Sequence, residues 1–110
     1  MSTISESLAK LIDFIEDESR HCKGSWAFTK GGNMTSPLDP KACRWCLLGA
    51  IYKLFPAHYS AGAALILSAE GIVLRDFLEF QLRTGLVGYN DNHSHKEIME
   101  RLRWLMKLYN

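Results

Sequence analysis

The sequence lacks the features that direct a chain to a membrane, to nucleic acid or to export. Its longest apolar run, residues 61–67, is far below the about 20 residues that a transmembrane helix needs. The 13 basic and 12 acidic side chains leave a formal net charge of +1, so no overall field attracts nucleic acid or an anionic membrane. The first residues show no positive stretch followed by an apolar segment, so we expect no signal peptide and a cytoplasmic location.

Cysteine is also scarce. An odd number of three cysteines without an export signal predicts free thiols. The sequence shows no internal repeat, no cofactor fingerprint and no complete catalytic constellation, so we expect no cofactor. What it does have is 110 residues with 47% hydrophobic content, which predicts one domain, residues 1–110, with its own core.

Helical periodicity dominates the chain. Apolar residues recur at helical spacing in the segments 3–19, 40–55, 60–69, 72–82 and 95–109, the last following a Ser-x-x-Glu capping box at 94–97. Residues 86–92 between the last two are expected to be irregular. A Gly-Gly-Asn turn separates residues 26–29 from 33–36, a pattern typical of a hairpin. The sequence predicts a mainly α, single-domain bundle of four to five helices with a small β-hairpin near residues 26–36.

The helix over 40–55 carries the most distinctive residues. Asp39 is expected to cap this helix, Pro40 is tolerated at its first position, and Pro56 is expected to end it. Gly49 inside this helix costs about 1 kcal/mol relative to alanine. We therefore expect another backbone or an aromatic ring to approach closely at Gly49.

The cysteines allow three interpretations. Cys43-Arg44-Trp45-Cys46 has the C-x-x-C form, but the predicted helical surroundings do not fit a redox pair. A closed zinc site with the ligands His21, Cys22, Cys43 and Cys46 is an alternative, although adjacent His21 and Cys22 fit one tetrahedron poorly. Free cysteines also serve as small hydrophobic core residues.

A nucleophilic cysteine is the second alternative. Cys46 or Cys43 would act with His58, His93 or His95 as the base and with Asn90 or Asp91 orienting the imidazole; His93 and Asp91 are the preferred partners of Cys46. Cys46 lies about two turns into the predicted helix, where the helix dipole is weak, and Cys43 lies nearer its start. Asn90-Asp91 has two interpretations. The two side chains bind a ligand, or they hydrogen-bond the nearby backbone of a loop ahead of the helix cap.

Three short motifs in order resemble those of a family of small uncharacterised bacterial and phage proteins. They are Gly24-Ser25-Trp26, Cys46-Leu47-Leu48-Gly49-Ala50 and Tyr89-Asn90-Asp91, the last with tyrosine where the family has tryptophan. The resemblance implies that Trp26, Cys46, Gly49, Asn90 and Asp91 converge in the fold. It implies no activity. Because the family occurs in phage genomes, an accessory role that inhibits a host defence complex is also implied.

These observations lead to three functional hypotheses. The first is a non-catalytic module that binds another protein or protein complex, with exposed aromatic anchors among Trp45, Tyr52, Tyr59 and Trp104. Trp45 and Tyr52 are predicted to share the outer face of the 40–55 helix. The others are a cysteine-dependent hydrolase or transferase and a zinc-stabilised nucleic-acid-binding protein. The expected binding residues are Trp26, Cys46, Asn90, Asp91, Trp45 and Trp104, and the oligomeric state stays open.

Overall fold

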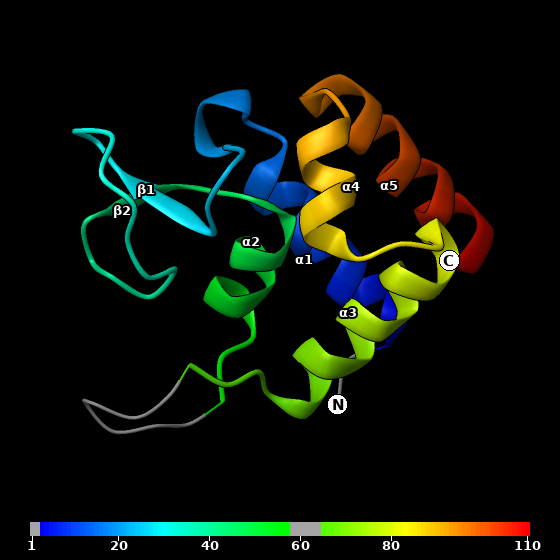
Figure 1. Ribbon diagram of the computed structural model, residues 1–110. Helices are drawn as coiled ribbons and strands as arrows, with labels where there is room; N and C mark the ends of the chain where they lie inside the picture. The colour runs from blue at the N-terminus through cyan, green and yellow to red at the C-terminus, as the bar shows by residue number, and fades with distance from the viewer. Residues whose placement is uncertain (1–2, 58–64) are drawn as a thin grey trace.

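The structure, a computed structural model, describes residues 3–57 and 65–110 (Figure 1). Helices dominate, with one small antiparallel sheet at the end of the molecule opposite the last helix, which confirms the predicted fold class. In the described ranges, no helix is both long and apolar enough to cross a membrane. The elements are α1 (Ile4–Ile15), η1 (Glu18–Arg20, a 3₁₀ turn), β1 (Ala27–Thr29), β2 (Ala42–Trp45), α2 (Leu47–Leu54), α3 (Ala69–Leu82), α4 (Leu86–Asn92) and α5 (His95–Tyr109).

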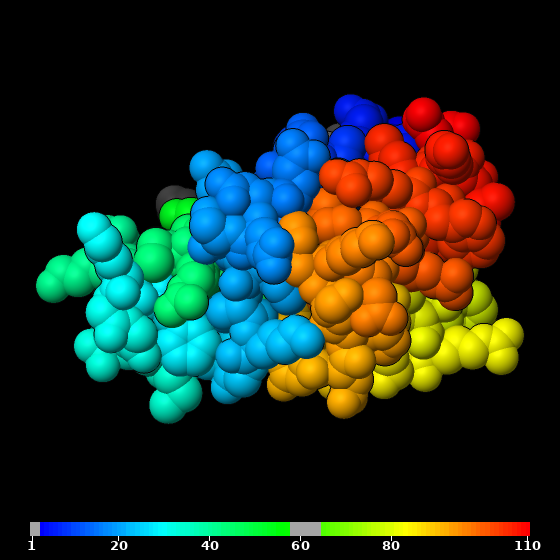
Figure 2. Space-filling view, turned by 90° about the horizontal axis from the view of Figure 1, so that it is seen from above, coloured from blue at the N-terminus to red at the C-terminus, as the bar shows by residue number. Residues whose placement is uncertain are grey.

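The first and last helices, α1 and α5, pack side by side (Figure 2). Each begins with a capping box, Thr3 with Glu6 in α1 and Ser94 with Glu97 in α5. Each presents one buried apolar stripe, as the helical spacing predicted. The fully buried side chains of these stripes are Leu8, Leu11, Ile15, Ile98, Leu102 and Leu105.

β1 pairs both with the segment that the sequence predicted and with a second strand that it did not predict. β1 runs antiparallel to β2, with Ala27 opposite Trp45 and Phe28 opposite Arg44. Residues 33–35 also contact β1, as the predicted hairpin requires: the Thr29 amide donates to the Asn33 carbonyl at 2.9 Å, the Thr35 amide donates to the Ala27 carbonyl at 3.0 Å, and an isolated antiparallel bridge joins Phe28 to Met34. The pairing with β2 buries Trp45, whose indole N–H donates to the Pro37 carbonyl at 3.0 Å.

The predicted helix over 40–55 was therefore wrong in its first half. Asp39 does not cap a helix; its carboxylate accepts from the Lys41 amide at 2.9 Å and from the Thr35 hydroxyl, which closes a turn. Aspartate and proline favour turns as readily as helix starts. The helix begins only at Leu47, so Cys46 stands at its N-cap and Trp45 lies in a strand, not on a helix face shared with Tyr52.

α3 also differs from expectation at both ends. The predicted 60–69 helix was wrong over its described part: residues 60–64 lie outside the described residues, whereas residues 65–68 form a non-helical segment with an isolated bridge between Leu67 and Pro56. Ser68 then caps a helix that begins at Ala69. Gly71 does not break α3. It lies in the first turn, where a Cβ would come within 2.9 Å of the Phe55 Cβ, so the missing side chain allows α3 to pack on the end of α2. α3 ends at Arg83, which adopts the left-handed conformation with φ 57°, and not at Gly85.

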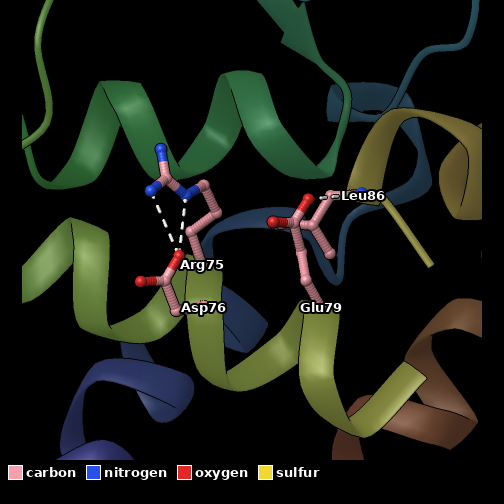
Figure 3. A network of polar contacts seen from close by, with 4 residues as sticks. All are labelled: Arg75, Asp76, Glu79 and Leu86. Carbon is pink, nitrogen blue, oxygen red and sulfur yellow. Dashed lines mark hydrogen bonds and ion pairs between the residues drawn. The ribbon is translucent and has the colours of Figure 1, made fainter. Parts of the chain in front are cut away.

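Residues 86–92, expected to be irregular, form α4. Its N-cap is Gly85, which has no side chain to satisfy the first amides. Glu79 of α3 supplies the missing acceptor, because its carboxylate accepts from the Leu86 amide at 3.1 Å (Figure 3). An anion at a helix start also interacts favourably with the helix dipole. The neighbouring Arg75–Asp76 ion pair at 3.1 Å is exposed on the same helix.

Candidate binding site

One buried carboxamide joins three distant parts of the chain. Asn90 on α4 is fully buried, and its side-chain oxygen accepts from the Leu47 amide, at the start of α2, at 3.1 Å. Its side-chain nitrogen donates to the Cys22 carbonyl at 3.0 Å. These two backbone groups fix the orientation of the carboxamide, since an amide N–H only donates and a carbonyl only accepts.

His21 completes this network, and its tautomer follows from the geometry. Nε2 of His21 lies 2.6 Å from the Asn90 side-chain oxygen, so Nε2 must carry the hydrogen that it donates. Burial is the main cause that lowers the pKa of His21, which favours this neutral form, and the nearby His95 lowers it further. The His21 ring lies 5.3 Å from that of His95 between ring centroids.

The three motifs of the resemblance do converge. Asp91 accepts from the Gly24 amide at 3.1 Å, and the Cys46 amide donates to the Trp26 carbonyl at 3.2 Å. The close approach expected at Gly49 is also confirmed, because a Cβ there would lie 1.9 Å from the Trp26 carbonyl oxygen. Most of the groups that meet here belong to the backbone, so the contacts mainly fix the path of the chain.

The thiol of Cys46 acts as a helix cap. Its Sγ accepts from the Gly49 amide at 3.3 Å. Burial raises the pKa of Cys46, an effect that the hydrogen bonds from the Gly49 and Leu48 amides only partly offset. Burial likewise raises the pKa of Cys22 to about 12. All three cysteines are free thiols, as predicted, and the two buried ones are held in the protonated form.

Of the two expected catalytic partners of Cys46, Asp91 lines the same cavity, whereas His93 faces Tyr89. His93 stacks on Tyr89, with ring centroids 3.9 Å apart, and its Nδ1 lies 2.8 Å from the Tyr89 carbonyl oxygen. Asp91 is bonded to Gly24 and Asn90 and not to an imidazole. In the described ranges, no hydrogen bond joins Cys46 to any histidine. The imidazole that Asn90 orients is His21, which the sequence pattern proposed only as a metal ligand.

The four proposed zinc ligands do not form a ligand set. No three His, Cys, Asp or Glu side chains within residues 3–57 and 65–110 are grouped closely enough to hold a metal ion. His21 faces Asn90, and the Cys22 thiol donates to the Ser25 carbonyl at 3.6 Å.

A cavity of about 530 Å³ lies beside the converged motifs. Its described walls come from the loop before β1, the loop between the strands, the start of α2, one face of α4 and Leu65 ahead of α3. Of the residues proposed for binding, Trp26, Cys46 and Asp91 line it, whereas Asn90 lies beneath it. Val87 also lines the cavity and was not predicted. It lies one helical turn before Asp91, so the two side chains share a face only because residues 86–92 form a helix.

The other proposed anchors divide by exposure. Trp45 is buried in the core, contrary to expectation. Tyr52 is half-buried and stacks on Trp26 with ring centroids 5.0 Å apart, and Tyr59 lies outside the described residues. Trp104 is 47% exposed on α5.

Comparison with known proteins assigns a family. A family profile described as "Family of unknown function (DUF6197)" matches residues 1–107. The chain belongs to this family. No curated protein and no solved structure matches the chain significantly. Family membership therefore brings no reaction or ligand, and the function has to be argued from the surfaces of this member of DUF6197.

Proposed function

We propose that this chain is a non-catalytic module that binds another protein through the face where the end of α3 meets α5. The observation that carries the proposal is the placement of Trp104. It is exposed and forms the shared wall of two hollows of about 460 and 530 Å³. Trp, Tyr and Arg in such settings supply most of the binding energy of protein interfaces.

The surroundings of Trp104 fit this role. Phe80 on α3 is 79% exposed and lines one of the hollows with Trp104. The guanidinium of Arg101 lies 4.6 Å from the centroid of the Trp104 ring, which holds both side chains in place. We name the three residues Phe80, Arg101 and Trp104 the aromatic face.

Two side-chain contacts join α3 and α5 beneath the aromatic face. Gln81 of α3 donates to the Tyr109 hydroxyl of α5 at 2.9 Å, and Phe77 meets the edge of the Tyr109 ring at 5.0 Å. These contacts tie the ends of the two helices together. A surface that is already ordered loses little conformational entropy when it binds, which favours affinity.

The resemblance to phage proteins extends the proposal to a partner class. We propose that the partner is a cytoplasmic host complex that a phage or mobile-element accessory protein inhibits. The support is the occurrence of the resembling family and the absence of a membrane-spanning helix in the described residues. The resemblance names no complex, so the experiment must identify it.

Site-specific photocrosslinking tests the proposal in host cells. A benzophenone amino acid replaces Phe80 in one variant and Met34, 73% exposed in the loop between the strands, in a control. We expect crosslinks to a discrete protein from position 80 alone, and Trp104→Ala to weaken binding of that purified protein at least about tenfold. Unchanged affinity of Trp104→Ala, or self-association of the chain through Trp104, would contradict the proposal.

A further inference from the structure

The cavity beside the converged motifs, here named the Asp91 cavity, has one charged wall and several apolar ones. Its volume of about 530 Å³ is within the range of small-ligand sites. Pro37, Val87, Leu65 and Trp26 contribute apolar surface, and within residues 3–57 and 65–110 Asp91 is the only charged residue that lines it. It lies apart from the aromatic face, whose hollows share no lining residue with it.

The carboxylate of Asp91 is fixed but not neutralised. One oxygen, Oδ1, accepts from the Gly24 amide at 3.1 Å and from the Asn90 side chain at 3.3 Å. Within residues 3–57 and 65–110, Oδ2 accepts no hydrogen bond and no cationic side chain forms an ion pair with Asp91. Asp91 is exposed, so the cavity presents to solvent an anion that these two hydrogen bonds orient, with Oδ2 available to a ligand.

The indole of Trp26 is fixed in the same wall. Its backbone carbonyl is bonded to the Cys46 amide, and one face of its ring is covered by Tyr52, with an interplanar angle of 17°. The side chain is nevertheless 38% exposed and lines the cavity. Tryptophan attracts cations more strongly than the other aromatic side chains do.

We propose that the Asp91 cavity binds an organic cation, a primary ammonium or guanidinium group carried on an apolar chain. Asp91 would pair with the charged group through Oδ2, and Trp26 and Val87 would contact the chain. An anionic ligand would be repelled by Asp91. A metal ion would find a single carboxylate, since the described residues hold no group of three candidate ligands.

The experiment follows the indole N–H signal of Trp26 by ¹H–¹⁵N NMR while three probes are added separately. These are Nα-acetyl-lysine methylamide, the neutral analogue Nα-acetyl-norleucine methylamide, which lacks the ammonium group, and butylammonium. We expect both cations to shift the Trp26 signal in a saturable way and the norleucine compound to bind at least about tenfold more weakly. Equal binding of the lysine and norleucine compounds to the unmodified chain would overturn the proposal without any variant.

Asp91→Asn is the matched variant, because its carbonyl oxygen can still accept from the Gly24 amide. We expect it to lose at least about tenfold in affinity for both cations. Asp76→Asn, which changes an exposed carboxylate on α3, should bind both cations with unchanged affinity. Unchanged binding by Asp91→Asn would overturn the proposal. Tighter binding of the lysine compound identifies a protein side chain as the source of the cation, and tighter binding of butylammonium a free amine. Trp104→Ala should leave this binding intact, so the site is tested independently of the aromatic face.

Discussion

The side-chain oxygen of Asn90 lies 2.6 Å from Nε2 of His21, a residue 69 positions earlier in the chain. The same oxygen accepts from the amide that begins α2, and the same carboxamide holds the carbonyl of Cys22. One fully buried side chain therefore fixes the segment after η1, the start of α2 and α4 relative to one another. Because these segments also form the Asp91 cavity, Asn90 positions that cavity from beneath.

Removing this carboxamide should be costly. We expect Asn90→Ala to lower the free energy of unfolding by about 3 kcal/mol or more, because it leaves a backbone amide, a backbone carbonyl and an imidazole without partners in the interior. Urea denaturation followed by circular dichroism measures the change. The control is Asn92→Ala, an exposed residue of the same helix whose side chain donates only to the Gly88 carbonyl, with an expected loss below about 1 kcal/mol. Similar losses in the two variants would contradict a positioning role for Asn90.

His21 should make stability depend on pH near neutrality. Its pKa in the folded chain is below the ordinary value of 6.5, so between those two values the unfolded chain binds more protons. The stabilisation is present above pH 6.5 and is lost as the pH falls toward the folded pKa. We expect the free energy of unfolding to decline as the pH is lowered below 6.5. His21→Gln keeps a donor for Asn90 but does not titrate, so its decline should be smaller; an identical decline would show that another group is responsible.

The thiols should differ in reactivity. Cys22 and Cys46 are buried and their pKa values are raised by burial, so at pH 7 they hold little thiolate. We expect iodoacetamide to alkylate them more slowly than free cysteine and to label the half-buried Cys43 first, as peptide mass mapping over time would show. In Cys43→Ser the fast phase should disappear. Rapid labelling of Cys46 in the folded protein would instead favour the cysteine-dependent enzyme.

The parts of the fold that the sequence predicted well are those that local signals determine. α1 and α5 each carry a Ser/Thr cap, a glutamate three residues later and an apolar stripe, and all of these act within one helix. α4 was missed because its first amide is satisfied by Glu79 of another helix. The start of α2 was misplaced because its cap is a cysteine, whose sulfur accepts from Gly49, while Asp39 offered a stronger but misleading cap signal.

The site was less predictable than the fold. The meeting of Trp26, Cys46 and Asp91 was implied by a family resemblance and not by spacing. The partner of His21 could not be found at all, because no local pattern connects it with Asn90 across the chain. Burial of Trp45 followed from its pairing with β1, which depends on a register that the sequence does not display.

The end of α3 should be open to stabilisation. Arg83 adopts the left-handed conformation, φ 57°, which costs a residue with a Cβ about 1 kcal/mol or more. Glycine adopts it freely and is the usual residue at such helix ends. We expect Arg83→Gly to raise the midpoint of thermal unfolding, and Arg75→Gly, in the interior of the same helix, to lower it. A decrease with Arg83→Gly would mean that contacts of the arginine outweigh the backbone conformation.

Gly49 should respond to substitution in the opposite direction from an ordinary helical glycine. Alanine in place of glycine inside a helix usually stabilises by about 1 kcal/mol. At Gly49 the added Cβ would lie 1.9 Å from the Trp26 carbonyl oxygen, a backbone atom that also accepts from the Cys46 amide. The loop carrying Trp26 cannot retreat without breaking that bond. We therefore expect Gly49→Ala to lower the free energy of unfolding by at least about 2 kcal/mol in urea denaturation.

The matched control is Gly88→Ala in α4, where the nearest contact of an added Cβ would be the Thr84 hydroxyl at 3.9 Å. This variant should gain up to about 1 kcal/mol, so the two glycines differ in the sign of the effect. The added Cβ in Gly49→Ala would also push the Trp26 backbone away from α2 and so change the wall of the Asp91 cavity. We therefore expect the indole N–H signal of Trp26 to move in Gly49→Ala and to stay in place in Gly88→Ala. A gain in stability for both variants would show that the Trp26 carbonyl does not lie close enough to Gly49 to exclude a Cβ.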